Sequence, residues 1–333
     1  MMGIIAAFTS CTNDDITISK ATNIKVNPST VIAPFTFEIN TGELETFAQG
    51  NKLRVSLLIY NQEGILQAKE VQYLTNYASL INPNINLPYV DYTAIAITDV
   101  VEYDDEVTFE FWKLVNEEKL TEAKIEDTGY IASQRGILGI AKKQFTVSEE
   151  NNKTKEINVE PAGGLFLVTL FNPLYFSDVV RVGALANKTA EHFEFDYQGN
   201  FSVSHASDGG DLSWWMCIFD IEDYNKGTTS AYKYYFIPKT NNYKFQFTVI
   251  TDEDDYIYLD DYSVNINQGD EYLLYLDLFD EEEESPYSFL LPVNGESERA
   301  NPSSTTDKLL QKIGADEFTK AAVNDGIYLK DVK

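Results

Sequence analysis

The chain has 333 residues, of which 44% are hydrophobic, so it is long enough for two domains of ordinary size with packed cores. Its formal net charge of −28 would repel phosphate backbones and anionic lipid headgroups. This charge argues against nucleic acid as a partner and against membrane attachment through a basic patch. The abundance of Tyr (21) and Phe (20) favours strands.

An apolar stretch at the start of the chain ends in Phe8-Thr9-Ser10-Cys11 and is followed by the polar, acidic residues 12–15. A short apolar segment that closes on small residues and a cysteine is typical of a bacterial lipoprotein signal. Cleavage before Cys11 would leave this cysteine to carry the lipid, and each buried CH₂ of an acyl chain contributes about 0.8 kcal/mol. No Lys or Arg precedes Cys11, so residues 1–11 form only a signal remnant, and a buried N-terminal strand is the alternative.

The second cysteine, Cys217, stands alone if Cys11 is lipidated, and no intramolecular disulfide is then possible. It lies in the apolar run 214–219, which predicts a buried packing residue rather than a nucleophile. No stretch after residue 11 reaches 18 consecutive apolar residues, so no other segment is expected to span a bilayer.

Residues 12–33 are polar and contain the breaker Pro28, so we expect a tether that leads into a first strand at 35–39. Alternating apolar residues then predict further strands. These predicted strands cover 53–60, 65–73, 87–98, 137–145 and 156–159. The charged segment 117–128 is expected to hold one short helix or a long loop.

A second group of strands begins at Gly163. The pattern predicts strands at 163–171, 193–197, 201–203, 243–249, 257–259 and 272–279, with turns at Gly199-Asn200 and at 268–270. In 243–249 the aromatic residues and Val occupy one face and the polar residues the other. This is the clearest period-two pattern in the chain.

Short strands separated by turn signals, with almost no long helical periodicity, predict a mainly β protein. We expect two tandem antiparallel β-sandwich domains, at 34–158 and 159–280, between an N-terminal lipid-anchored tether and a polar C-terminal extension. This tail, 281–333, begins with an acidic run and contains two short apolar pieces, 289–291 and 327–329. Either piece could add a strand to a sheet edge, and a loosely docked extension is the alternative.

Three stretches carry a resemblance to a known family: 52–64 (KLRVSLLIYNQEG), 87–96 (LPYVDYTAIA), and 137–147 together with 157–159. With a lipoprotein cysteine followed by acidic residues and two tandem sandwiches, the chain resembles the fimbrillin-like and fimbrial-anchor lipoproteins of the Bacteroidales. The resemblance covers about residues 11–280. It implies transthyretin-like sandwiches, export to the outer membrane and cell surface, and a role in pilus anchoring, assembly or adhesion.

The same resemblance implies that the partners are other fimbrial subunits, joined by β-strand addition, and that the membrane is held through lipid on Cys11. The family's polymerising subunits are thought to be trimmed by an arginine-specific protease near the N-terminus. No Arg occurs here before Arg54, which lies in a predicted core strand. This absence favours an anchor or accessory subunit over a main stalk subunit.

The sequence offers little sign of catalysis or of a cofactor, and we expect a non-enzymatic protein. His192 and His205 are too few and too isolated for a zinc site, and there is no Gly-x-Ser-x-Gly motif and no Gly-rich phosphate loop. Three acids of one segment, Asp252, Asp254 and Asp255, are a weak Ca²⁺ candidate. They lack the usual spacing of a Ca²⁺ loop, so a solvated turn between two strands is favoured.

The three tryptophans, Trp112, Trp214 and Trp215, are the remaining candidates for binding, as a stacking platform for sugars. Neighbouring residues of a strand point to opposite faces, so one of Trp214 and Trp215 is expected in a core and the other exposed or at a domain junction. Core packing is favoured for most aromatic residues. The alternative function is therefore a glycan-binding outer-membrane lipoprotein that uses exposed aromatics.

Overall fold

The computed structural model describes residues 19–28, 51–75, 81–128, 136–150, 154–171, 179–207, 212, 214–220, 230–251, 256–277 and 287–292. Every regular element in this part of the chain is a strand, and it contains no helix long and apolar enough to cross a membrane. The prediction of a mainly β fold is confirmed.

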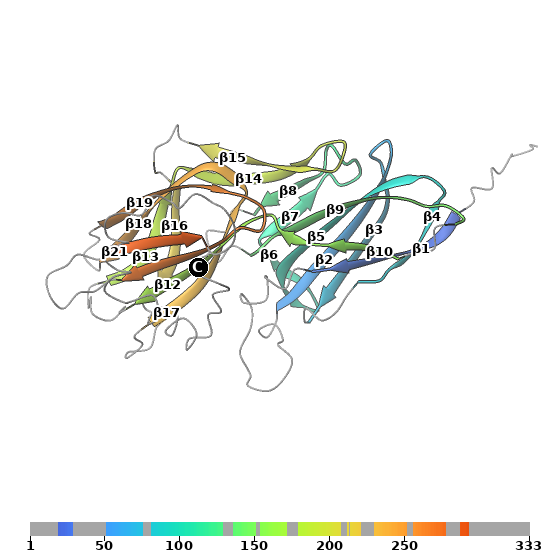
Figure 1. Cartoon of the computed structure of the whole chain (residues 1–333). Helices are drawn as coiled ribbons and strands as arrows, with labels where there is room; N and C mark the ends of the chain where they lie inside the picture. Colours follow the sequence, from blue (N-terminus) through green and yellow to red (C-terminus); the bar gives the residue numbers. More distant parts are fainter. Residues whose placement is uncertain are drawn as a thin grey trace, which may run out of the picture.

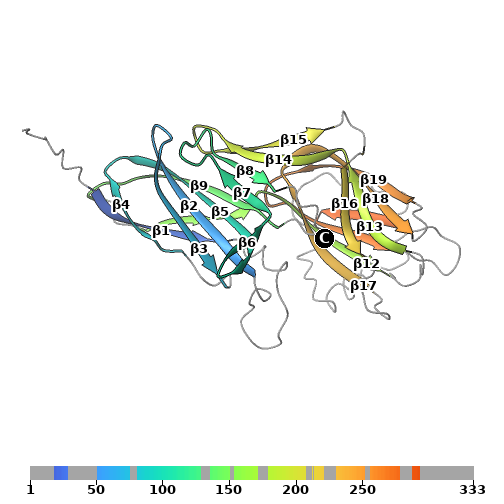
Figure 2. The same cartoon turned by 180° about the vertical axis from the view of Figure 1, so that it is seen from behind.

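The strands form two lobes, which Figures 1 and 2 show from opposite sides. The first half of the chain provides β1 (Ser19–Asn27), β2 (Asn51–Asn61), β3 (Leu66–Leu74), β4 (Asn84–Pro88), β5 (Asp91–Asp104), β6 (Glu106–Glu110), β7 (Trp112–Val115), β8 (Lys124–Asp127), β9 (Gly139–Thr146), β10 (Lys155–Asn158) and β11 (Glu160–Pro161). The second half provides β12 (Gly163–Phe171), β13 (Val179–Ala186), β14 (Lys188–Phe195), β15 (Phe201–Ser207), β16 (Trp214–Asp220), β17 (Ser230–Pro238), β18 (Thr240–Thr251), β19 (Tyr256–Ile266), β20 (Glu271–Asp277) and β21 (Tyr287–Pro292).

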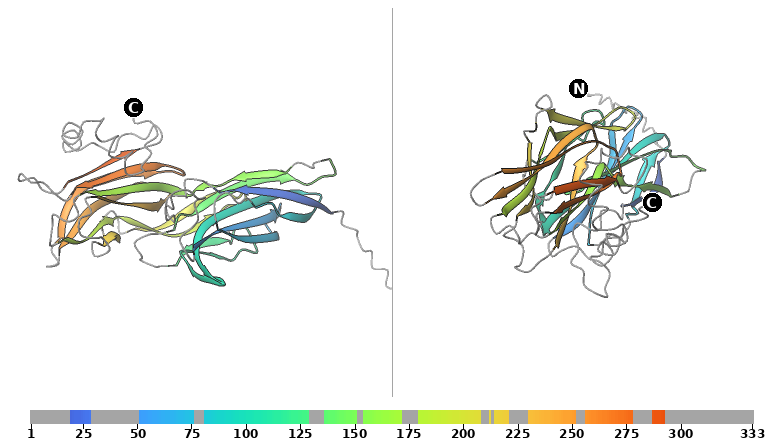
Figure 3. Two further views of the ribbon diagram at one scale, coloured as in Figure 1. Left: turned by 90° about the horizontal axis from the view of Figure 1, so that it is seen from below. Right: turned by 60° about the vertical axis from the view of Figure 1, so that its left-hand side comes forward.

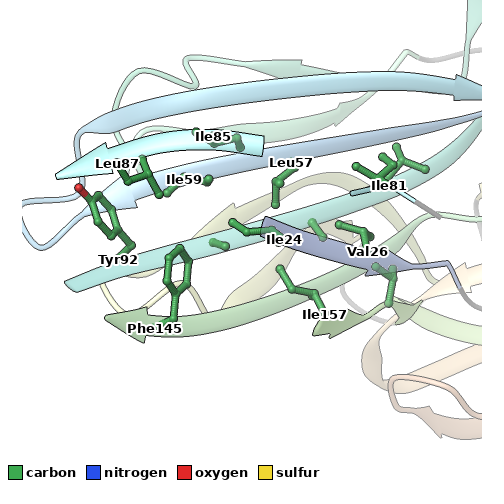
Figure 4. Packing of buried hydrophobic residues seen from close by; sticks show 14 of the residues in the cluster. Ile24, Val26, Leu57, Ile59, Ile81, Ile85, Leu87, Tyr92, Phe145 and Ile157 are labelled. Carbon is green, nitrogen blue, oxygen red and sulfur yellow. The ribbon is translucent and has the colours of Figure 1, made fainter. Parts of the chain in front are cut away.

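A sandwich of two sheets forms the first lobe. One sheet has the strand order β10-β1-β4, and the other has the order β11-β9-β5-β2-β3, with β6 paired to β5. Aliphatic side chains from both sheets fill the space between them, together with the stacked rings of Tyr92 and Phe145, whose centroids are 5.7 Å apart (Figure 4). The core therefore depends on strands that are far apart in the sequence.

Strand β2 is buried on both of its faces. The alternating residues Leu53, Val55, Leu57 and Ile59 face the sandwich core and are fully buried, as the sequence pattern predicts. Their neighbour Leu58, on the opposite face, is also fully buried, in a second cluster. A sheet with apolar residues on both faces needs a third layer to cover it.

The third layer is a sheet with the order β15-β14-β8-β7, so both halves of the chain contribute to it. Phe193 of β14 lies opposite Ile125 of β8 in the antiparallel register. Trp112 of β7 is buried, and its ring lies 5.5 Å from that of Phe193 and 6.3 Å from that of Phe236. The division into domains at residues 158–159 stays a prediction, and this layer contains strands from both sides of it.

The second lobe packs the sheet β17-β12-β20-β21 against the sheet β16-β13-β18-β19. Phe166 of β12 stacks on Tyr272 of β20 and makes an edge contact with Phe245 of β18. On β18, Tyr243, Phe245 and Phe247 are buried while Lys244, between the first two, is exposed, which confirms the predicted alternation. Two strand pairs among the described strands are parallel, β1 with β10 and β12 with β20; the other named pairs are antiparallel.

The segment predicted as a tether, 12–33, instead contributes β1 over Ser19–Asn27. Ile24 and Val26 of this strand are fully buried in the first core. The prediction failed because only two large apolar residues alternate here, among polar ones, and the strand's partners are distant in sequence. The first strand predicted at 35–39 lies outside the described residues.

Two other predicted elements differ in detail. The strand predicted at 87–98 is interrupted after Pro88, where the N–H of Val90 donates to the carbonyl of Pro88 at 3.0 Å, and the chain crosses from one sheet to the other. The charged segment 117–128 forms turns and β8 instead of a helix. Its turn is fixed by Leu120, which is buried and donates its N–H to the carbonyl of Gly64 at 2.8 Å.

The start of the predicted polar tail also carries structure. Residues 287–292 form β21, which pairs antiparallel with β20. The apolar piece at 289–291 therefore completes a sheet of its own chain. The rest of the tail, including 327–329, lies outside the described residues.

Candidate functional site

The most informative feature for function is the position of β1 in its sheet. β1 pairs in parallel with β10 on one side and antiparallel with β4 on the other, so it is the central strand of three. Figure 4 shows Ile24 and Val26 pointing into the core between the two sheets. Because the central place is filled by the chain's own strand, this sheet offers no vacant slot between β4 and β10.

Polar contacts hold both ends of β1. Near its start, the ammonium of Lys20 donates to the carbonyl of Glu149 at 2.7 Å. At its end, the side-chain amide of Asn27 donates to the side-chain oxygen of Asn158 at 2.8 Å, and the N–H of Val159 donates to the carbonyl of Asn27 at 2.9 Å. These contacts add to the ladder hydrogen bonds, so β1 is an integral part of the first sandwich.

β1 begins at the outer end of the first lobe, away from the second lobe (Figure 3). The proposed lipidation residue, Cys11, lies outside the described residues and eight positions before Ser19. An extended chain covers at most about 3.3–3.6 Å per residue, so this stretch reaches no further than about 29 Å. A lipid on Cys11 would therefore keep the first lobe close to the membrane surface.

Within the described part of the chain, β21 is the edge strand of one sheet of the second lobe. Among the described strands β21 pairs with β20 alone, with Tyr287 opposite Asp277 and Pro292 opposite Tyr272. An edge strand presents backbone N–H and C=O groups with which another chain can pair. Pro292 cannot donate a hydrogen bond, so it marks one end of the stretch available for pairing.

A buried ionic network fixes β6 and β7 against the outer face of the first lobe's larger sheet. The guanidinium of Arg54 on β2 donates to both carboxylate oxygens of Asp99 on β5, at 2.8 and 2.6 Å, and also to Glu110 on β6 and to the carbonyl of Trp112. Burial raises the pKa of Asp99 to about 6, and the charge and hydrogen bonds of Arg54 oppose this rise. The sequence does not single out Asp99 or Glu110, because the chain has 53 Asp and Glu residues and nothing in its pattern marks these two as partners of Arg54.

The structure places the three tryptophans in different environments. Trp112 is 1% exposed and its indole N–H donates to the carbonyl of Gly136 at 2.7 Å, so it is a core residue and cannot stack on a sugar. Trp214 is half-buried on β16, opposite Ala186 of β13, and its indole nitrogen is buried without a hydrogen-bond partner among the residues that the structure describes. Trp215 is the next residue of the same strand, so the role of this pair as ligand aromatics stays a prediction.

The titratable candidates do not assemble into a catalytic or metal site in the part of the chain that the structure describes. His192 and His205 lie on the neighbouring strands β14 and β15, and His192 faces Ser204 in the register. Burial lowers the pKa of His205, and the nearby charge of Lys188 lowers it further. The Ca²⁺ candidates Asp252, Asp254 and Asp255 lie outside the described residues.

No protein-family model and no curated protein sequence matches this chain. Among solved structures, the chain is similar to a candidate polysaccharide-binding protein from Bacteroides thetaiotaomicron, with a TM-score of 0.48, 11% identity, and coverage of 86% of this chain and 99% of that one. It is also similar to the fimbrial anchor protein Mfa2 from Porphyromonas gingivalis, with a TM-score of 0.39 and 9% identity. This match covers 84% of this chain and 99% of Mfa2. The tip fimbrial protein Mfa3 from the same organism gives a TM-score of 0.46 and 5% identity. This match covers 83% of this chain and 100% of the Mfa3 structure. Fimbrial proteins of the Bacteroidales are thus among the structures that this chain resembles.

Proposed function

We propose that the chain is a cell-surface lipoprotein that acts as a non-catalytic fimbrial subunit, in an anchor, accessory or adhesin role. The observation that carries this proposal is the central position of β1 in the first sandwich. A sandwich completed by its own N-terminal strand cannot take up a strand from another subunit at that place. The N-terminal end is therefore suited to attachment rather than to further polymerisation.

Attachment would come from lipid on Cys11 in the outer membrane. The short stretch between Cys11 and β1 would hold the first lobe at the membrane, with the second lobe pointing away from it. The names of the similar structures, a fimbrial anchor and a fimbrial tip protein, support a role at one end of a filament. Both an anchor and a tip subunit need one closed end and one end that binds a neighbour.

Contact with other fimbrial subunits would use strand addition at the open edge beside β21. Backbone hydrogen bonds to an added strand provide affinity, and pockets for alternate side chains provide specificity. For the glycan-binding alternative, Trp214 and Trp215 remain the candidate aromatics, because Trp112 is buried in the core.

The membrane part of the proposal is tested by Cys11→Ala, expressed from the complete reading frame. We expect the variant to move from the membrane fraction to the soluble fraction, and mass spectrometry to find lipid on Cys11 of the wild type. Unchanged fractionation of the variant, or a wild type without lipid, would remove the basis for anchoring.

The assembly part is tested by two truncations, after residue 286 and after residue 292, in a pull-down of pilins from outer-membrane extracts. The second truncation keeps β21 and the first removes it, so the pair isolates the edge from the rest of the tail. We expect pilins to co-purify with the wild type and with the chain that ends at 292, and to be lost from the chain that ends at 286. Equal recovery from both truncated chains would show that this edge does not bind subunits.

A further inference from the structure

The outward face of the first lobe's smaller sheet is rich in asparagine. Figure 4 shows Ile24, Ile85 and Leu87 turned toward the core, and successive side chains of a strand point to opposite faces, so the residues that alternate with them lie on the outward face. The asparagines that this alternation places there are Asn23, Asn27, Asn82, Asn84, Asn86 and Asn158, and the remaining members are Ala21, Lys25 and Glu156. We call this surface the asparagine face.

The strand register brings amide side chains of this face together. Asn84 of β4 lies directly opposite Asn23 of β1. The Cβ atoms of such a cross-strand pair are about 4.5–5.5 Å apart. Asn82 and Asn86 lie two residues from Asn84 on either side, and a strand rises about 3.3 Å per residue, so their spacing from it is roughly 7 Å. These four amides therefore form one continuous patch over β1 and β4.

The same four amides are exposed, and their side chains have no partner among the residues that the structure describes. The other polar groups of the face are already paired. The ammonium of Lys25 lies 3.5 Å from the carboxylate of Glu156, and the side-chain amide of Asn27 donates to the side-chain oxygen of Asn158 at 2.8 Å. The described part of the face thus offers free amides and no free charge.

Strand formation does not explain these asparagines, because asparagine is depleted in strands. Charged side chains can keep an exposed strand soluble, as Lys142 and Lys143 do on β9, whereas the charges of this face offset each other. An amide side chain both donates and accepts hydrogen bonds. A row of free amides therefore suits a partner whose own groups also donate and accept.

The composition of the asparagine face selects the class of partner. A protein partner would need aromatic or aliphatic anchors at the centre of the interface, and Ala21 is the only apolar residue among the described members of the face. An anionic polymer would be repelled by the net charge of −28 and would meet no free cation here. A neutral polysaccharide carries many hydroxyls, each of which donates and accepts, and its binding requires no charge.

We propose that the asparagine face binds a neutral polysaccharide, whose hydroxyls exchange hydrogen bonds with the free amides of Asn23, Asn82, Asn84 and Asn86. The short side chain of Ala21, which lies opposite Asn86, leaves room for a sugar ring to approach the sheet. The site uses no aromatic side chain and involves neither Cys11 nor β21. It therefore stands or falls apart from the proposed fimbrial role.

The test is affinity electrophoresis of the purified full chain in native gels that contain dextran, mannan or laminarin as neutral polysaccharides. Polygalacturonate serves as the anionic comparison, and an unrelated acidic protein corrects for changes in the gel itself. We expect at least one neutral polysaccharide to slow the chain, increasingly as its concentration rises. Polygalacturonate should not slow it, because the face has no free cation among its described residues.

Two variants locate the site. The double variant Asn84→Ala/Asn86→Ala removes two neighbouring amides and should weaken binding by about tenfold, with little change in melting temperature, because both side chains are exposed and without a described partner. Gln144→Ala removes an exposed amide from β9, in the other sheet of the same lobe, and should leave binding unchanged. Three results would each overturn the proposal: no retardation by any of the three neutral polysaccharides, equal retardation by polygalacturonate, or wild-type retardation of the double variant.

Discussion

Truncation of one buried side chain in β1 tests whether this segment is part of the first sandwich. Ile24 is 0% exposed and packs in the first core, so Ile24→Ala leaves a cavity between the two sheets. Substitutions of this kind cost about 2–5 kcal/mol. The neighbouring Lys25 points outward with its side chain 32% exposed, and its ammonium lies 3.5 Å from the carboxylate of Glu156. An exposed pair of this kind contributes about 0–1 kcal/mol, so Lys25→Ala is the matched control.

Thermal unfolding measures the difference between the two variants. For domains of this size each 1 kcal/mol shifts the melting temperature by about 2–4 °C, so Ile24→Ala should lower it by roughly 4–20 °C. Lys25→Ala should change it by only a few degrees. Hydrogen exchange should also show faster opening of β4 and β10 in Ile24→Ala, because both strands pair with β1. Equal and small shifts for the two variants would refute the assignment of β1 to the core and restore the tether interpretation.

Three further predictions concern other parts of the molecule. Phe247→Asp should abolish cooperative unfolding of the second lobe, because it places an unpaired carboxylate in the core. Lys244→Asp, on the exposed face of the same strand, should change the melting temperature little. Equal melting temperatures for the two variants would contradict the register of β18. The raised pKa of Asp99 means that the folded state binds its proton more tightly than the unfolded chain, so this group makes stability fall as the pH rises from about 4 to about 6. Asp99→Asn should lower stability overall, because Arg54 loses its bidentate carboxylate partner and keeps only Glu110, and should flatten the pH dependence of urea midpoints in that window; an unchanged slope would contradict the shift. Truncation after residue 286 should lower the unfolding temperature of the second lobe, which loses β21, more than truncation after 292 does, and identical curves would show that β21 adds no stability.

The strands that the sequence predicted well are those whose local pattern agrees with their surroundings. β18 alternates cleanly because one face is buried and the other is exposed. The hairpin of β14 and β15 was predicted from its turn, where Gly199 adopts a φ of +80°, a conformation that glycine tolerates and other residues rarely adopt. In each case the information lies within a dozen residues.

The features that the sequence did not predict depend on residues far apart in the chain. β1 has too few apolar residues to stand out, and only its pairing with β4 and β10 makes it a strand of the core. Trp112 is a candidate for ligand binding in the sequence, and it becomes a core residue through Phe193 and Phe236. The ion pair of Arg54 and Asp99 depends on the pairing of β2 with β5, which no spacing in the sequence reveals.

The third layer has a consequence for how the two lobes behave. Leu58 and Ile95 are fully buried on the outer face of the first lobe's larger sheet, in the same cluster as Phe193 and Phe236 from the second half of the chain. A chain cut at residues 158–159 would lose β14 and β15 from this layer and expose apolar residues that are now covered. The two lobes therefore share one buried cluster in addition to their separate cores, and a separately expressed first half is expected to need that cover. Because packed side chains join the lobes here, the two lobes are expected to move together rather than as independently hinged domains.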